Sequence, residues 1–226
     1  MALISRKHGF LFIMPPRTGC TAIYTVLTKA VGAERIPAQD ILAEDGTIAV
    51  PCKHTRLPQL LNAGLITAEE RQRLFVFTTV RNPFDSLVSL YGKKAGRYQK
   101  LLQDRSSWIY KIPGFAEDIE YCRTHSFEEW VLRSYWPRWW QRIRGAGRRS
   151  MLDRYAAGVD FVMRFETLQR DLDTALAKVG APRVEVPRIN PTDHRPPDYR
   201  PSYSPRARRA VEYTFREDLR KYGYSF

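Results

Sequence analysis

The chain has 226 residues, which is long enough to bury one sizeable hydrophobic core and short for two independent domains. Its net charge of +13 favours an anionic partner, such as nucleic acid, a membrane surface, a polyanionic sugar or a phosphorylated small molecule. The three cysteines are widely spaced, so neither a disulfide framework nor a metal cluster is indicated, and a reducing, cytoplasmic location is expected.

The first predicted element is a buried strand over residues 9–14, which runs into a turn and then a helix at about residues 20–31. The apolar run is too short for a membrane span and lacks the layout of a cleavable signal. The turn reads Pro-Pro-Arg-Thr-Gly at residues 15–19. Backbone N–H groups and the positive end of the helix dipole meet at such a turn, which therefore predicts an anion site.

Two more strands are expected in the first half of the chain. A short strand is predicted at residues 48–52. The strongest strand signal lies at residues 74–80, and a helix follows it, because Asn82 can cap that helix and Pro83 can occupy its first turn.

A fourth unit pairs a strand at residues 160–165 with a helix at about residues 166–179. A single final helix is expected from Pro205, with Ser204 as its cap. The alternation of strands and helices predicts an α/β fold in which helices cover a parallel sheet.

Two stretches interrupt this alternation. Residues 92–158 are predicted to form a helical insertion rich in aromatic and basic residues, and residues 182–204 an extended proline-rich loop. We interpret residues 1–226 as one domain that contains both. The insertion holds all five tryptophans of the chain: Trp108, Trp130, Trp136, Trp139 and Trp140.

A second anion site is predicted at the carboxyl end of the third strand. Arg81 ends that strand and Ser89 lies two helical turns further on, so both side chains can converge on one phosphate. The loop at residues 15–19 has neither the leading glycine nor the Gly-Lys pair of a nucleotide triphosphatase loop. The sequence thus predicts a phosphate-binding loop built for something other than ATP and magnesium.

At these two motifs the chain resembles the sulfotransferase family. PPRTGCTAI is similar to the family's loop for the 5′-phosphosulfate end of PAPS (3′-phosphoadenosine 5′-phosphosulfate), and VRNPFDSLVSLY is similar to its 3′-phosphate motif. Weaker matches, such as FVMRFETLQRDL, recur in the order of carbohydrate-type members over nearly the whole chain. The resemblance implies a P-loop-like α/β fold and PAPS as co-substrate. It also implies donor-binding roles for Pro16, Arg17, Thr18, Gly19, Cys20, Thr21, Ala22, Arg81 and Ser89.

The chain departs from the family pattern at two places. Arg17 stands where most members have lysine, so the cation beside the bridging oxygen becomes a guanidinium, which keeps the charge and changes its shape. The 3′-phosphate motif often has a further arginine where this chain reads Phe84, Asp85 and Ser86. A second phosphate contact is therefore absent or comes from the arginine-rich insertion.

The resemblance also suggests catalytic roles. Sulfuryl transfer moves a group in line between two oxygens and relies on positioning and charge stabilisation, with no metal required. Arg17 is expected to stabilise the leaving phosphate. Lys53 stands beside His54, so it is a candidate for stabilising the transferring group or a solvated surface residue. His54 is the preferred general base for the acceptor hydroxyl, since the ordinary pKa of histidine is about 6.5. Glu166 is the next candidate for the base, and His194 could instead lie over the acceptor.

The expected function is sulfuryl transfer from PAPS to a hydroxyl group, with a carbohydrate or glycoconjugate as the preferred acceptor. A sugar, a glycolipid and an aromatic natural product all suit the arginine and tryptophan content. Two alternatives come from other classes. A P-loop-type small-molecule kinase would need the missing Gly-Lys pair, and a basic nucleic-acid-binding domain would need a reader motif, so no nucleic-acid partner is expected.

Overall fold

The computed structural model describes residues 2–137, 150–187 and 197–226. None of the helices in these ranges combines the length and the apolar composition that crossing a membrane requires. Three residues singled out from the sequence lie outside the described residues: Trp139, Trp140 and His194.

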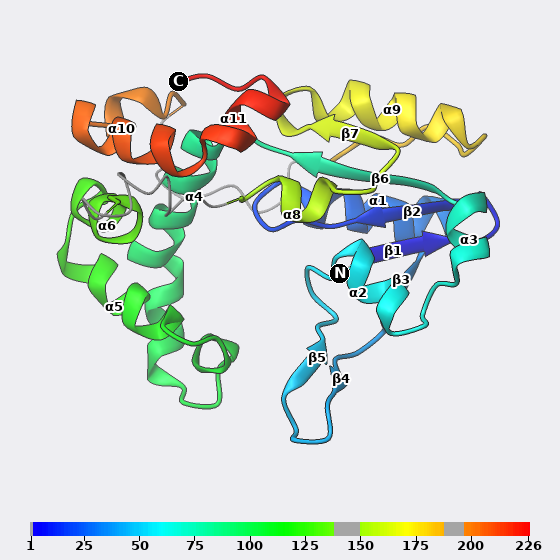
Figure 1. Cartoon of the computed structure of the whole chain (residues 1–226), viewed down its shortest axis with the longest axis horizontal. Coiled ribbons are helices and arrows are strands. Elements are labelled where there is room, and N and C mark those ends of the chain that lie inside the picture. The colour runs from blue at the N-terminus through cyan, green and yellow to red at the C-terminus, as the bar shows by residue number, and fades with distance from the viewer. Residues whose placement is uncertain (1, 138–149, 188–196) are drawn as a thin grey trace. The chain divides into compact units, whose positions relative to one another are not determined.

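The chain folds into two compact units, whose helices and strands are labelled in Figure 1. The first unit comprises Met1–Arg81 and Leu152–Ile189, and the second comprises Asn82–Met151 and Asn190–Phe226. The interpretation of the whole chain as one domain with an insertion and a proline-rich loop stays a prediction.

A five-stranded sheet lies at the centre of the first unit, in the order β3-β1-β2-β6-β7. β2, β6 and β7 run parallel to one another, as the sequence predicts, whereas β1 pairs antiparallel with both β2 and β3. The predicted P-loop-like α/β fold is confirmed, with an antiparallel extension that the sequence pattern does not predict. The strands span Ala2–Ser5 (β1), Phe10–Ile13 (β2), Glu34–Ile36 (β3), Phe75–Val80 (β6) and Phe161–Arg164 (β7).

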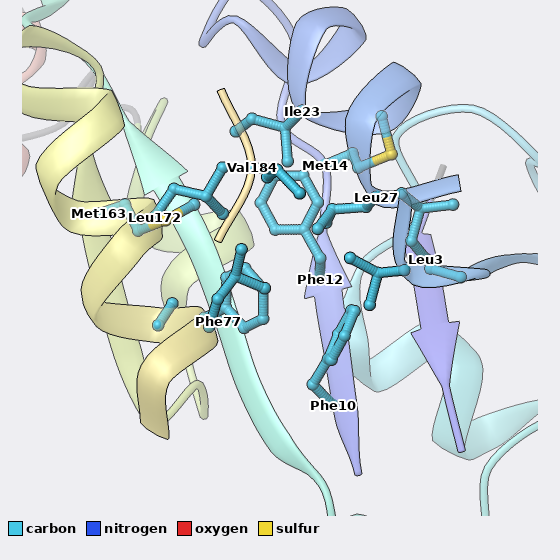
Figure 2. Packing of buried hydrophobic residues seen from close by; sticks show 14 of the residues in the cluster. Leu3, Phe10, Phe12, Met14, Ile23, Leu27, Phe77, Met163, Leu172 and Val184 are labelled. Atoms are coloured by element: carbon cyan, nitrogen blue, oxygen red, sulfur yellow. The ribbon is translucent and has the colours of Figure 1, made fainter. Parts of the chain in front are cut away.

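One face of this sheet packs against α1 (Cys20–Val31) and α9 (Leu168–Lys178). The rings of Phe12 and Phe77 stack within this layer, with their centroids 5.1 Å apart. Figure 2 shows Leu27 of α1 beside the ring of Phe12. The buried layer anchors α1 on the sheet and so fixes its N-terminus, where the first anion site is predicted.

The opposite face of the sheet packs against α2 (Leu57–Asn62) and α8 (Asp153–Ala156). Leu60 of α2 and Tyr155 of α8 are buried in this second layer. A third short helix, α3 (Ala68–Arg73), leads into β6. Both faces of the parallel strands are therefore covered by helices, as a parallel sheet requires.

The predicted second strand does not enter this sheet. Ile48–Val50 (β5) pairs with Ile41–Leu42 (β4) in a separate two-stranded antiparallel sheet. Leu42 is 60% exposed and Ile48 is 44% exposed. The predicted strand therefore forms, but its expected place in the parallel sheet is wrong, because this segment lacks the two buried faces that a central parallel strand needs.

The second unit is helical. Its main core joins α4 (Pro83–Ala95), α6 (Phe127–Tyr135) and α10 (Pro205–Thr214). The Asn82 side chain caps α4, as predicted, by accepting a hydrogen bond from the Phe84 N–H at 3.0 Å. The remaining described helices span Arg97–Gln103 (η1), Trp108–Lys111 (η2), Phe115–Thr124 (α5), Arg200–Ser202 (η4) and Arg216–Tyr222 (α11).

The predicted single C-terminal helix is divided into two. Ser204 caps α10, as expected, by accepting a hydrogen bond from the Ala207 N–H at 3.1 Å. α10 ends at Thr214 and α11 begins at Arg216, because Phe215 between them leaves helical geometry with ψ at 21°. Phe215 is buried in the core of the unit.

A buried charge cluster joins α4, α5 and α6 of this unit. The Lys94 ammonium is paired with Asp118, and the indole N–H of Trp130 donates to the same carboxylate at 3.1 Å. The ammonium also lies 4.7 Å from the ring centroid of Phe115. Trp130 is therefore a packing residue, whereas Trp108 is exposed to solvent.

Candidate functional site

The loop between β2 and α1 has an unusual backbone. Arg17 has a φ of 71° and Gly19 a φ of 73°, both in the left-handed region. Among the described residues, only Arg17 and His54 have positive φ without being glycine. Holding a side chain in this region costs on the order of 1–3 kcal/mol, and such residues cluster at ligand sites.

Side chains of the first unit hold three carbonyl groups of this loop. The contacts are His54 Nδ1 to Met14 O (2.9 Å), Thr18 Oγ1 to Pro15 O (3.0 Å) and Arg81 Nη1 to Arg17 O (2.8 Å). These carbonyl oxygens are thus occupied by donors of the protein, whereas the first amide groups of an α-helix have no acceptor within it. A row of such N–H groups at a helix N-terminus attracts an anion.

Gly19 is required at its position for two reasons. Its φ is one that residues with a Cβ rarely adopt. A Cβ there would also lie 3.0 Å from Leu168 Cδ2 and 3.1 Å from Phe165 Cε2. The loop therefore rests directly on the segment that joins β7 to α9.

Arg81 lies at the end of β6 and is only 3% exposed. Its guanidinium carbon lies 4.2 Å from the ring centroid of Phe165, and one of its nitrogens donates to the loop. Ser89 is buried on α4, in the second unit. The predicted convergence of Arg81 and Ser89 on one phosphate stays a prediction.

The geometry of His54 fixes its tautomer. Its φ of 57° is left-handed, and its ring reaches the Met14 carbonyl, which can only accept a hydrogen bond. Nδ1 therefore carries the proton, and the lone pair of Nε2 is left to accept one. This is the tautomer that a general base acting through Nε2 needs.

Burial lowers the pKa of His54 to about 4. The hydrogen bond to Met14 acts in the opposite direction, and the positive charges of the N-terminus, Lys53 and Arg17 lower the pKa further. The imidazole is therefore neutral at pH 7.

The sequence profile of the sulfotransferase family matches residues 1–225. The chain belongs to the sulfotransferase family. No curated protein and no solved structure matches it. Membership assigns the chain to the transferases of sulfuryl groups, and members of the family generally use PAPS as the donor.

The remaining residues expected in the site of this sulfotransferase lie on the loop and first turn of α1, on the segment before α2, and between β7 and α9. Thr21 is exposed on the first turn of α1, Lys53 is exposed beside His54, and Glu166 is exposed on η3 (Phe165–Thr167). The rest of the predicted loop set divides by exposure: Pro16 is exposed, and Cys20 and Ala22 are buried.

Cys20 is the first residue of α1, and its side chain is buried. Burial raises the pKa of its thiol, although the N-terminus, Arg17 and nearby backbone N–H groups oppose that effect. The thiolate form that would react is therefore scarce at neutral pH. Within the described ranges, His, Cys, Asp and Glu side chains do not gather in groups of three or more that could hold a metal ion.

Phe165, which packs beside the loop, is not among the residues predicted from the sequence. It lies inside FVMRFETLQRDL, which resembles the family only weakly. Its ring packs on Arg81 and lies 3.1 Å from where a Cβ at Gly19 would be, and both residues belong to segments far from it in the chain. The position of Phe165 could have indicated a role at the site, because it directly follows a parallel strand and ligands bind at the carboxyl ends of such strands.

Proposed function

We propose that this sulfotransferase moves the sulfuryl group of PAPS to a hydroxyl group of a carbohydrate or glycoconjugate, with His54 as the general base. One observation carries the proposal: the loop whose Arg17 backbone is left-handed is tied, through Met14, to a neutral histidine. The proposed anion-binding loop and the proposed base are thus linked by the hydrogen bond from His54 Nδ1 to the Met14 carbonyl oxygen, at 2.9 Å.

The residues of the loop suit the 5′-phosphosulfate end of the donor. Arg17 supplies positive charge, Thr21 an exposed hydroxyl, and the first turn of α1 its amide groups. Arg81 and Ser89 are the residues we assign to the 3′-phosphate, by their match to the family motif. When bound, PAPS supplies the sulfuryl group, which forms a bond to the acceptor oxygen as its bond to the 5′-phosphate breaks.

Arg17 and the loop amides stabilise the negative charge that grows on the departing phosphate. His54 accepts the proton of the acceptor hydroxyl on Nε2, so that the oxygen can attack without becoming a cation. Lys53 is exposed beside His54 and balances the charge on the transferring group.

A pKa of about 4 would make His54 a weak base, so the donor must change it. An anion beside an imidazole favours the charged form and raises its pKa. We therefore expect the pKa of His54 to rise toward its ordinary range when adenosine 3′,5′-bisphosphate is bound. Titration of the His54 ring signals by NMR, with and without this product, measures the change.

The acceptor is proposed on chemical grounds alone. The charge of +13 suits an acidic glycan or glycolipid, and aromatic residues suit the face of a sugar ring. The three cysteines are unpaired, which fits work in a reducing, cytoplasmic environment.

Thermal stabilisation tests the donor. Adenosine 3′,5′-bisphosphate without magnesium should raise the Tm, and adenosine 5′-monophosphate, which lacks the 3′-phosphate, should raise it much less. A larger shift with ATP and magnesium would support a kinase, and a shift with an oligonucleotide alone would support a nucleic-acid-binding domain. Transfer of label from PAPS to a panel of glycans, glycolipids and phenols then identifies the acceptor class.

A further inference from the structure

Phe165 lies against two residues at the loop between β2 and α1: Gly19, which belongs to the loop, and Arg81, which donates a hydrogen bond to it. The Arg81 guanidinium carbon sits 4.2 Å from its ring centroid, and its Cε2 atom is 3.1 Å from where a Gly19 Cβ would be. Both contacts lie within the first unit. The ring therefore leaves no room for a side chain at Gly19 of the loop, and it reaches the loop a second time through Arg81.

Through Arg81, Phe165 is linked to Arg17, the residue with the left-handed backbone. Arg81 donates to the carbonyl oxygen of Arg17 at 2.8 Å, and Arg17 has a φ of 71°. A left-handed residue with a side chain persists only where its surroundings over-determine it. A hydrogen bond from a guanidinium that is itself packed on an aromatic ring supplies such a constraint.

We propose that Phe165 is a positioning residue for sulfuryl transfer: it holds the Arg81 guanidinium against the Arg17 carbonyl and so keeps Arg17 in its left-handed conformation. The inference rests on the proposed function, in which Arg17 stabilises the departing phosphate. In this role Phe165 does not contact the reacting atoms.

The role requires an aromatic ring. A cation over a flat ring face is attracted by the negative potential of the ring, and guanidinium is planar and stacks well. Leucine would fill much of the same volume without offering that face. Tyrosine would keep it, so Phe165→Leu and Phe165→Tyr separate ring chemistry from volume.

Phe161 provides a matched control. It lies on β7 and is partly buried, as Phe165 is, and its ring stacks on Phe75 with the centroids 6.2 Å apart. Phe161→Leu thus removes a ring from the same region of the core without touching the support of the loop. A role of Phe165 in packing alone would make the two leucine variants alike.

The experiment compares kcat at saturating PAPS, affinity for adenosine 3′,5′-bisphosphate and Tm in the full chain. Phe165→Leu should lower kcat by at least about tenfold, because small displacements of positioning groups have effects of that size or larger. Phe165→Tyr should restore most of the loss, and Phe161→Leu should lower Tm with little change in kcat. Equal kcat in the two leucine variants would overturn the proposal.

Two further readouts separate this proposal from the function on which it rests. The effects of Arg81→Lys and Phe165→Leu on kcat should be strongly non-additive, and additivity would contradict the contact as the route of the effect. The Thr18 amide, which shares a peptide bond with the Arg17 carbonyl, should shift in the NMR spectrum of Phe165→Leu and stay unchanged in that of Phe161→Leu. That measurement needs no donor, so it tests the support of the loop even if PAPS fails to bind, which would refute only the proposed function.

Discussion

The two units differ in where their backbones carry strain. In the first unit, Arg17 and His54 are held at positive φ, although both have side chains. In the described part of the second unit, positive φ is confined to Gly114 and Gly223, which adopt it freely. Strain is therefore concentrated at the two residues that sequence motifs assign to chemistry, and its cost is met by the packing around them.

The two units also differ in what their buried cations bind. Lys94 in the second unit pairs with Asp118 and packs against aromatic rings, and these contacts join its helices. Arg81 in the first unit also packs on a ring, yet it donates to the carbonyl of a loop. One buried cation joins the helices of a core, and the other holds the backbone of a loop.

Replacing Arg17 should have the largest effect. Arg17→Ala should lower kcat by about a thousandfold, as the loss of a group that stabilises transition-state charge can do. Arg17→Lys should keep most of the activity if charge alone matters, and Arg17→Gly is the control for the backbone. The glycine variant should be as inactive as the alanine variant and more stable, by about 1 kcal/mol, because it relieves the left-handed conformation. Steady-state kinetics and urea unfolding measure both effects, and an active Arg17→Gly enzyme would remove the side chain from the mechanism.

Breaking the pair between Lys94 and Asp118 should have the next largest effect, and this effect should be on the free energy of unfolding and not on kcat. Lys94→Met leaves the largely buried Asp118 carboxylate without its counter-charge, with the Trp130 N–H still donating to it, which should cost about 3 kcal/mol of unfolding free energy. The double variant with Asp118→Asn should recover part of that loss. Folded protein should keep its kcat, and a drop in kcat without loss of stability would contradict the division between the two cations.

His54→Asn should lower kcat by about a hundredfold, as the loss of a general base does. Asparagine tolerates the left-handed conformation, so the loop before α2 should keep its shape and the affinity for adenosine 3′,5′-bisphosphate should stay unchanged. His54→Ala serves as the comparison, since alanine also loses the backbone fit. Near-normal turnover of the asparagine variant would transfer the role of base to Glu166.

The smallest expected effect is on the pH dependence of stability. The unfolded chain binds a proton at His54 as the pH falls through about 6.5, whereas the folded chain does so only near pH 4, where the lowered pKa lies. The free energy of unfolding should therefore decrease as the pH is lowered through this window. His54 alone should account for a decrease of about 2 kcal/mol between pH 7 and pH 5. Urea unfolding of the wild type and His54→Asn at both values isolates this contribution, and parallel pH curves would refute the burial of a neutral imidazole.

The sequence predicted the fold best where local signals and burial agree. α1 begins at Cys20 and ends at Val31, as expected, because glycines flank it on both sides and its apolar face covers the sheet. β1 was not predicted, since a short buried strand next to the N-terminus is recognised only by its pairing with β2. The place of β5 in a separate sheet was not predicted, because an exposed strand and a buried strand can contain the same apolar residue types.

For the site, the sequence identified residues but not their contacts. Arg17, His54 and Arg81 stand out from their positions after predicted strands. The hydrogen bond from Arg81 to the Arg17 carbonyl joins positions 64 apart, and no local pattern encodes it. The left-handed backbone of Arg17 and His54 is equally invisible in sequence, because neither residue type is chosen for that conformation.

Gly19 has a consequence for how a ligand would bind. Its buried rear face, against Phe165 and Leu168, leaves the loop little freedom to open. The conformational entropy of this loop is then lost when the protein folds and not when the donor arrives. A preorganised loop of this kind should bind small anions such as inorganic sulfate in the same backbone conformation as a full nucleotide donor, which makes rigidity itself a means of discriminating by charge and size.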